Sequence, residues 1–272
     1  MITFYIYQKM CLRQLKKIKE YRHLCKMTEE LPIIIVPARL ASVRFPRKLL
    51  QEVNGIPLII HTARRLVDVA PEFDILFAVD GEELESVLSG NGFETIMTNP
   101  DLPSGTDRIF AANHKAQRSK VINVQADEPL VQRDHILSLV EAINRPGASM
   151  ATLAVPFDNQ EDFNDRNQVK VVLDRSGFAL YFSRVPVPQF RESSSFQDFL
   201  EADYRPLKHL GLYGYTRDFL LKFSQTPQGK LEYIEKLEQL RALEMGENIA
   251  VSVVKSGTIG IDVPKDLEKL HL

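Results

Sequence analysis

The stretch Leu31–Lys48, LPIIIVPARLASVRFPRK, decides the fold expected for the rest of the chain. It opens with an apolar run, Leu31–Val36, that lacks polar alternation. Such a run is typical of a strand buried on both faces of a parallel sheet. Pro37 cannot donate a ladder hydrogen bond, so the strand is expected to end there. The loop that follows carries three cations: Arg39, Arg44 and Lys48.

A cationic loop after a buried strand lies at the edge of an open α/β sheet where ligands bind. Three cations there repel one another unless an anion joins them, and a nucleoside triphosphate is the obvious candidate. A solvated basic turn would be the favoured interpretation of an isolated motif, but the position after a first buried strand reverses this preference. The stretch contains neither G-x-x-x-x-G-K-[ST] nor G-x-G-x-x-G. A Walker-type kinase and a nicotinamide-dependent dehydrogenase therefore lose their main support.

Composition limits the class of protein. The 272 residues are 44% apolar, enough for one large α/β domain or two small ones. The formal charge is −2, but residues 1–26 hold seven Lys and Arg against one Glu, a net +6 that leaves −8 for the body. An acidic body argues against general nucleic-acid binding, which needs a broad basic face.

Cysteine usage and hydropathy point to the cytoplasm. Cys11 and Cys25 both lie in residues 1–26, so the body has no disulfide framework, zinc cluster or cysteine nucleophile. A reducing compartment is the natural setting for such a body. No apolar stretch approaches the roughly 18 residues that span a membrane, so we expect no membrane span.

Beyond the first stretch, apolar periodicity predicts alternating strands and helices. The expected strands are Phe73–Val79, Phe93–Thr98, Val121–Gln125 and Met150–Val155, and the expected helices are Ile59–Val69, Glu82–Ser89, one from about Gly105, and Asp134–Ile143. This alternation predicts an α/β fold with a doubly wound, mostly parallel sheet.

The pattern changes after Pro156. It predicts a hairpin at Val169–Arg184, followed by a polar loop at Gln189–Pro206 and a strand at His209–Thr216. A long helix at Leu231–Met245, a last strand at Ile249–Val254 and a terminal helix from Pro264 complete the chain. We therefore expect a single domain over residues 27–272, in which residues 156–230 form a smaller antiparallel region.

Two aspartates follow predicted strands on the ligand edge. Asp127 lies in NVQADEP and Asp262 in GIDVP. Mg²⁺ typically binds one or two protein carboxylates together with phosphate oxygens. Helix capping or a turn explains either residue taken singly. Together with three cations, however, they match the requirements of phosphoryl-group chemistry.

Other polar residues are weaker candidates. Ser104-Gly105-Thr106 opens a predicted helix, where amides and hydroxyls suit a nucleoside, although capping explains it equally well. His209 and Tyr213 share one face of a predicted strand, but a packed structural histidine is commoner. For Glu238 and Gln239, on the predicted helix Leu231–Met245, a solvated polar face is the default.

The body resembles the 3-deoxy-manno-octulosonate (Kdo) cytidylyltransferase family, also called CMP-Kdo synthetases. The motifs that carry the resemblance occur in order between about Leu31 and Leu270: PARLASVRFPRK, SGTDR, NVQADEP, MATLAVP, VKVVLD, ALYFSR, HLGLYGY, LEQLR and GIDVPKDLEKL. The resemblance implies a nucleotide-diphospho-sugar transferase-like fold. It also implies a reaction in which the anomeric hydroxyl of Kdo attacks the α-phosphorus of CTP, giving pyrophosphate and CMP-Kdo for lipopolysaccharide biosynthesis.

Site roles follow from the same motifs. The resemblance implies that the triphosphate and nucleoside contact Arg39, Arg44, Lys48, Ser104, Gly105, Thr106 and Gln125. It implies that the sugar contacts Gln125, Arg184, His209, Tyr213, Glu238 and Gln239. Asp127 and Asp262 would hold Mg²⁺, and Arg39, Lys48 and Asp127 would be catalytic. A homodimer formed through the antiparallel region is also implied.

Two positions depart from the family pattern and keep alternatives open. Arg47 and Ala126 stand where the family usually has glycine, a residue that permits positive φ and close ligand approach. One alternative is a related enzyme acting on an amino-substituted Kdo or a sialic acid. The other is a non-catalytic nucleotide-binding homologue, against which the retention of Asp127 and Asp262 argues.

The basic leader, residues 1–26, is predicted to contribute nothing to the fold. No family motif falls before Leu31, and Met27 is the predicted initiator. A basic helix on anionic lipid is the alternative, but apolar residues are few. A chain starting at Met27 is expected to match the full chain in activity, dimerisation and melting temperature. A loss of half the activity, or of several degrees, would show that the leader docks on the body.

Overall fold

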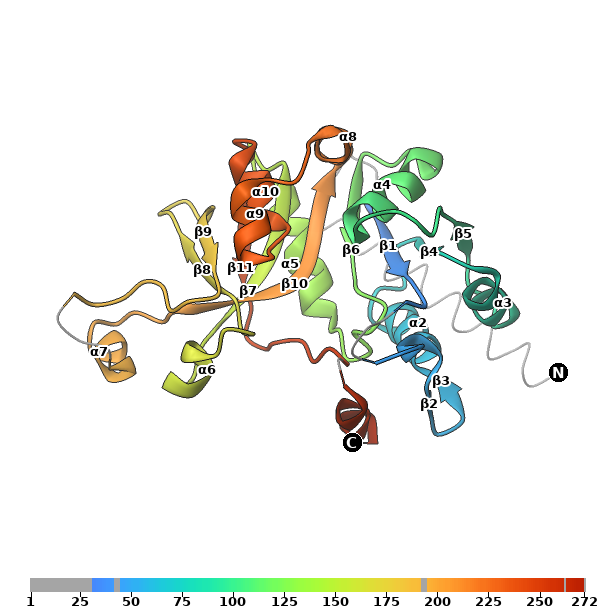
Figure 1. The fold of residues 1–272 in the computed structure, drawn as a ribbon, viewed down its shortest axis with the longest axis horizontal. Coiled ribbons are helices and arrows are strands. Elements are labelled where there is room, and N and C mark those ends of the chain that lie inside the picture. The colour runs from blue at the N-terminus through green and yellow to red at the C-terminus, as the bar shows by residue number, and fades with distance from the viewer. Residues whose placement is uncertain (1–30, 42–44, 192–194, 262, 272) are drawn as a thin grey trace.

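The computed structural model describes residues 31–41, 45–191, 195–261 and 263–271. The predicted leader, Arg44 and Asp262 lie outside the described residues. The described part confirms the predicted class: a mostly parallel central sheet with helices on both faces and a smaller antiparallel extension (Figure 1).

The central sheet has the order β11-β7-β10-β6-β1-β4-β5, with β8 and β9 attached to β10. Its strands are β1 Ile33–Ala38, β4 Ile75–Val79, β5 Thr95–Met97, β6 Lys120–Asn123, β7 Met150–Pro156, β8 Lys170–Leu173, β9 Ala179–Ser183, β10 Leu207–Thr216 and β11 Ile249–Val253. A separate hairpin joins β2 Glu52–Val53 to β3 Ile56–Pro57. Pairing is parallel in β5–β4–β1–β6 and in β7–β11, and antiparallel wherever β10, β8 or β9 takes part.

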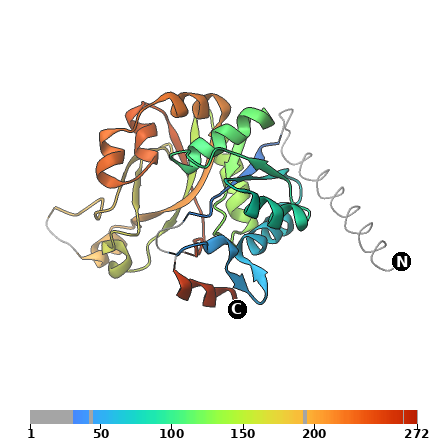
Figure 2. The same ribbon diagram turned by 45° about the vertical axis from the view of Figure 1, so that its right-hand side comes forward.

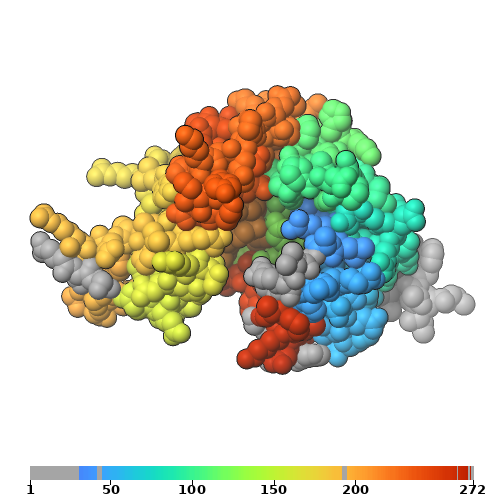
Figure 3. All heavy atoms as spheres, viewed as in Figure 1, coloured from blue at the N-terminus to red at the C-terminus, as the bar shows by residue number. Residues whose placement is uncertain are grey.

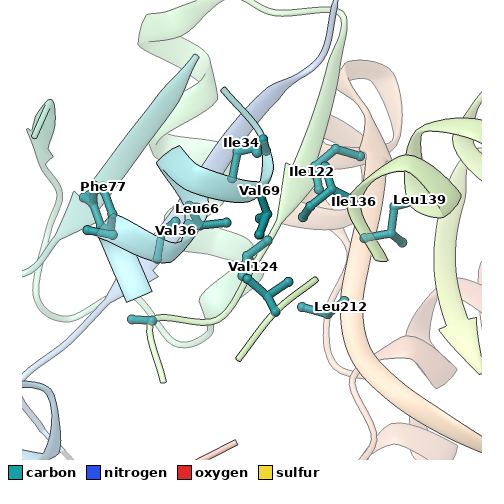
Figure 4. Close-up of a cluster of buried hydrophobic side chains, with 14 of the residues drawn as sticks. Ile34, Val36, Leu66, Val69, Phe77, Ile122, Val124, Ile136, Leu139 and Leu212 are labelled. Carbon is teal, nitrogen blue, oxygen red and sulfur yellow. The ribbon is translucent and has the colours of Figure 1, made fainter. Parts of the chain in front are cut away.

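Helices cover both faces of this sheet (Figure 2). One face packs against α2 Leu58–Val69, α3 Glu82–Gly90 and α5 Arg133–Ile143, and the other against α4 Gly105–Ala116, α8 Arg217–Gln225 and α10 Gln239–Glu244. Successive residues of β1 alternate between the two cores: Ile34 joins the first and Ile35 the second, both fully buried. Figure 4 shows the first core, where Ile34, Phe77 and Ile122 gather. The unbroken apolar run of β1 is explained by burial on both faces.

Strand β10 does not follow the simple alternation of parallel strands and helices. It inserts antiparallel between β6 and β7, pairing Tyr213 with Asn123 on one side and with Thr152 on the other. Gly214 allows α5 to approach closely, because a Cβ there would lie 3.2 Å from Cβ of Ile143. The strand therefore leaves the smaller region and brings its side chains into the middle of the central sheet.

The prediction that the first strand ends before Pro37 is wrong, since β1 continues through Pro37 to Ala38. Pairing with β6 stops at Ile35, whereas pairing with β4 continues to Ala38. Pro37 thus has a strand on one side only, and such edge positions tolerate the missing N–H.

Two predictions after residue 185 are also corrected. The predicted loop Gln189–Pro206 contains a helix, α7 Phe196–Glu201, whose Phe196 and Phe199 pack with Phe163 of α6 Gln160–Asn164. The predicted long helix Leu231–Met245 is two short ones, α9 Lys230–Glu235 and α10. Lys236 breaks it by adopting a left-handed conformation with φ 53°.

The shorter elements complete the chain. They are the 3₁₀ helices η1 Lys48–Leu50 and η2 Pro264–His271. The terminal segment predicted from Pro264 is therefore helical, but of the tighter 3₁₀ type.

Candidate active site

A cavity of about 490 Å³ lies beyond the carboxyl ends of β1 and β6, between the central sheet, α4 and the α9–α10 corner. Figure 3 shows the molecule hollowed at its centre, below the orange helices of α8–α10 and beside the blue β1 segment. Eight of the residues predicted from the sequence line this cavity: Arg39, Gly105, Thr106, Gln125, His209, Tyr213, Glu238 and Gln239. The described candidates Lys48, Ser104, Asp127 and Arg184 lie outside its lining.

The start of the cationic loop is fixed by Asp80, the residue that follows β4. Both carboxylate oxygens of Asp80 accept the backbone N–H of Leu40, at 3.2 Å each. Asp80 also attracts Arg108, whose pKa is nevertheless lowered because burial outweighs this attraction. The carboxylate at the end of β4 therefore positions the loop that begins at Arg39.

Ser104 serves as a helix cap, and the neighbouring residues line the cavity. Its Oγ accepts the backbone N–H of Asp107 at 3.1 Å, as an N-cap of α4. In the SGTDR motif, the capping interpretation therefore applies to Ser104, and the ligand interpretation applies to the adjacent Gly105 and Thr106, which line the cavity. The hydroxyls of Ser104 and Thr106 also lie near Glu238 and act to lower the pKa of its carboxyl. Desolvation nevertheless raises the pKa of Glu238, so the predicted nucleotide and sugar residues meet around one partly buried carboxyl group.

His209 is held as a neutral ring. The hydroxyl of Thr152 donates to the main-chain oxygens of the β10 bulge, with 2.8 Å to Leu212. Because the hydroxyl proton is used in this way, the Thr152 oxygen accepts a hydrogen bond from Nε2 of His209, 2.9 Å away. Burial lowers the pKa of His209 to about 3. The remaining ring nitrogen, Nδ1, is left as an acceptor in the cavity lining.

This neutral ring gives a stability prediction. The pKa of His209 is depressed from 6.5 to about 3, so as pH falls the unfolded chain takes up this proton before the folded one. The contribution to stability is complete above pH 6.5 and is lost between about pH 6.5 and 3. We expect His209→Gln to remove about 2 kcal/mol of the stability difference between pH 7.5 and pH 5.0.

Thermal melting at the two pH values measures this difference. His114→Gln, at an exposed position on α4, is the matched control and should leave the difference as in the wild type. An unchanged difference in His209→Gln would show that the His209 ring takes up its proton at the same pH in the folded and unfolded protein.

Tyr213 links the central sheet to the α9–α10 corner. Its hydroxyl donates to Oε1 of Gln239 at 3.5 Å, and its ring stacks on Tyr215 with centroids 5.9 Å apart. Desolvation raises the pKa of Tyr213 well above its ordinary value. The phenol is therefore a neutral donor at physiological pH. Lining residues that sequence reasoning missed include Asn123 on β6, Lys208 on β10 and Lys236 at the helix break.

Lys48 and Asp127 meet although 79 residues separate them. The ammonium of Lys48 forms a salt bridge with Oδ2 of Asp127. The backbone N–H of Ile261 donates to the main-chain oxygen of Asp127 at 3.0 Å. The residue after Ile261 is Asp262, which lies outside the described residues. Among residues 31–41, 45–191, 195–261 and 263–271, no three His, Cys, Asp or Glu cluster as a metal site.

Arg184 binds main-chain carbonyls beside the cavity. Its Nε, Nη1 and Nη2 donate to the oxygens of Glu235, Arg166 and Lys236, at 2.6, 3.0 and 3.3 Å. These carbonyls border two segments that line the cavity, one starting at Asn167 and the other at Lys236. Arg184 therefore fixes the cavity wall in this structure, and its predicted contact with the sugar remains a prediction.

Comparison with known proteins places the chain in context. The cytidylyltransferase family matches residues 33–249. A 3-deoxy-manno-octulosonate cytidylyltransferase of Nitratiruptor sp. is 44% identical over 88% of this chain and 98% of its own length. An 8-amino-3,8-dideoxy-manno-octulosonate cytidylyltransferase of Shewanella halifaxensis is 42% identical over 86% and 94%.

A solved structure is similar as well. It is a CMP:2-keto-3-deoxy-manno-octonic acid synthetase complexed with CTP, which is 35% identical and covers 89% of this chain and 97% of its own, with a TM-score of 0.80. Within the part of the chain that the structure describes, no helix is long and apolar enough to cross a membrane.

Proposed function

The chain belongs to the cytidylyltransferase family, and on that basis we propose that it transfers CMP from CTP to the anomeric hydroxyl of Kdo. A bond forms between the anomeric oxygen and the α-phosphorus, the bond to the pyrophosphate oxygen breaks, and the hydroxyl proton is released. The observation that carries the proposal is that one cavity is lined by Arg39, Gln125, His209 and Gln239. Residues expected to bind nucleotide and residues expected to bind sugar thus face one space.

The proposed work of the protein is positioning and charge neutralisation. Arg39 and Lys48, with Arg44, bind the triphosphate and stabilise the departing pyrophosphate. Gly105 and Thr106 at the start of α4 lie beside the nucleoside. The neutral acceptor Nδ1 of His209 and the donor hydroxyl of Tyr213 orient sugar hydroxyls. Gln125, two residues beyond β6, lies between the two substrates.

The residues present fit Mg²⁺. The Asp127 carboxylate lies on the ligand edge and already holds one cation, the ammonium of Lys48. Oxygen ligands of this kind suit Mg²⁺. We propose that Asp127 and Asp262 hold the ion and that Lys48 then turns to the phosphates. The chemistry that Mg²⁺ supplies when bound is polarisation of phosphate oxygens.

Pyrophosphate release tests the proposal and separates the related substrates. Purified protein with CTP and Mg²⁺ is given Kdo, 8-amino-substituted Kdo or a sialic acid. We expect the largest kcat/KM with Kdo. A larger value with another sugar would reassign the substrate. Absence of turnover with all three would leave the non-catalytic alternative.

The charge of the cavity favours Kdo over the amino-substituted sugar, although relatives of both kinds are similar to this chain. Among described lining residues, Arg39, Lys208 and Lys236 are cationic and Glu238 alone is acidic. An excess of positive charge attracts the sugar carboxylate and repels an ammonium group.

Arg184→Lys is expected to raise the KM for the sugar about ten-fold and to leave the KM for CTP within two-fold. A lysine cannot span three carbonyls or grip a carboxylate through two parallel bonds. Both KM values come from initial rates of pyrophosphate release. A raised KM for CTP with an unchanged KM for Kdo would assign Arg184 to the other substrate.

A homodimer is the proposed assembly. Several apolar side chains of the smaller antiparallel region are exposed, namely Leu180, Val185, Phe190 and Tyr204. Burying such residues against a second copy removes apolar surface from water. We further propose that the enzyme works in the cytoplasm and supplies CMP-Kdo for lipopolysaccharide biosynthesis.

A further inference from the structure

Asn123, at the carboxyl end of β6, carries a polar atom that the fold leaves unsatisfied. The residue lies opposite Ile35 of β1 and Tyr213 of β10, in the middle of the sheet. Only 2% of its surface is exposed, and it lines the cavity. Its Oδ1 has no hydrogen-bond partner among the described residues. A buried acceptor without a partner is costly, and native structures retain few of them.

Tyr215 lies beside the Asn123 amide. Burial raises the pKa of Tyr215, and the neighbouring side chains of Thr106 and Asn123 oppose that rise only in part. The Tyr215 hydroxyl also lies 3.4 Å from Oγ1 of Thr106. Because Oδ1 of Asn123 has no partner among the described residues, it is available to a ligand.

A complementary donor lies on the opposite element. Gln239 is 4% exposed, and its Nε2 likewise has no partner among the described residues. Tyr213, the cross-strand neighbour of Asn123, donates to the Oε1 of the same side chain. The wall thus presents one unsatisfied acceptor and one unsatisfied donor. A polyhydroxylated ligand suits such a pair, because each hydroxyl both donates and accepts.

We propose that Oδ1 of Asn123 accepts a hydrogen bond from one non-anomeric hydroxyl of the sugar substrate and helps to determine which sugar is accepted. The inference rests on the proposed function, since it assigns the sugar to the wall formed by Tyr213 and Gln239. Loss of a hydroxyl from the ligand leaves Oδ1 buried and unpaired, which is the kind of penalty by which polar sites reject deoxy analogues.

The test is a thermodynamic cycle in which Asn123 is mutated on one side and single hydroxyls are removed from the sugar on the other. Calorimetry measures the binding of Kdo, and of analogues that each lack one non-anomeric hydroxyl, with a CTP analogue that cannot release pyrophosphate. We expect one deoxy analogue to bind the wild-type protein about ten-fold or more weakly than Kdo. In Asn123→Leu, Kdo and that analogue should bind equally. In Asn123→Asp, which keeps an acceptor, the discrimination should return.

Controls separate a contact from a structural role. CTP affinity should stay within two-fold in both variants, and melting temperatures verify folding, with Asn123→Ala replacing the leucine variant if that fails to fold. Equal losses for every deoxy analogue in wild type and Asn123→Leu would overturn the inference while leaving the proposed function intact. Failure of the wild-type protein to bind or turn over Kdo would overturn the proposed function and this inference with it.

Discussion

Replacing Asp127 by asparagine is expected to reduce pyrophosphate release about 1,000-fold at saturating CTP, Kdo and Mg²⁺. Asparagine keeps the shape of the side chain but removes the charge that pairs with Lys48 and that is proposed to bind Mg²⁺. Charge stabilisation by such a metal amounts to several kcal/mol, which corresponds to two or three powers of ten in rate.

Two comparisons make this result specific. Asp134→Asn changes an exposed carboxylate in the first turn of α5, and it should keep at least half the activity. Asp262→Asn is expected to lose as much activity as Asp127→Asn, from the sequence motif alone. Binding of Mn²⁺ in the presence of CTP should weaken in both variants. Turnover close to wild type in either variant would remove that residue from the metal site.

The largest loss of stability is expected from Arg241→Met. Arg241 joins α10 to α9 through two bonds to Glu232, with Nε 2.6 Å from Oε2 and Nη2 2.7 Å from Oε1. The side chains are only 11% and 6% exposed, and the hydrogen bonds to Glu232 are the main cause of the raised pKa of Arg241. Removing one member of a buried pair leaves the other uncompensated, at a cost of about 3–5 kcal/mol.

Chemical denaturation measures this loss, and an exposed ion pair provides the control. Lys222 also pairs with a glutamate, Glu247, at 3.0 Å, but its side chain is 64% exposed, so Lys222→Met should cost at most about 1 kcal/mol. The double variant Arg241→Met/Glu232→Leu should recover most of the stability, because no buried charge remains. A similar small loss in Arg241→Met and Lys222→Met would show that the Arg241–Glu232 pair is solvated.

The same pair matters for the site. It fixes the corner at Lys236, from which Glu238 and Gln239 enter the cavity. Arg241→Met is therefore expected also to raise the KM for the sugar more than that for CTP.

Local patterns predicted most strands of the central sheet, and the family resemblance implied eight of the residues that line the cavity. The apolar run of β1 predicted burial on both faces, and the motifs around Gln125, His209 and Gln239 indicated residues that the fold brings together. Positions set by long-range pairing were not predictable in this way. Nothing local shows that β10 enters the centre of the sheet, or that it places Tyr213 opposite Asn123.

The break between α9 and α10 was missed for a different reason. Apolar periodicity continues across Lys236, and no glycine or proline marks the left-handed residue. Tertiary contacts hold it, including the bond from Arg184 to the carbonyl of Lys236. Arg184 therefore helps to hold Lys236 in its left-handed conformation, and the local sequence around neither residue indicates this contact.

The two departures from the family pattern have different consequences. Arg47 has φ 54°, the left-handed conformation that glycine adopts without strain. Its guanidinium pairs with Glu83, so it adds no charge to the cavity lining. Ala126 has no positive φ, and its side chain is buried in the first core. Arg47 thus carries backbone strain of about 1 kcal/mol or more, whereas Ala126 carries none of this kind.

Phosphorus NMR of the reaction mixture tests the central claim most directly, because it resolves the phosphodiester of a CMP-sugar from CMP, CDP and pyrophosphate. With CTP, Kdo and Mg²⁺, the account predicts equal amounts of CMP-Kdo and pyrophosphate, and neither product when the sugar or the metal is omitted. Release of free CMP or CDP without the phosphodiester, or no consumption of CTP at all, would contradict it.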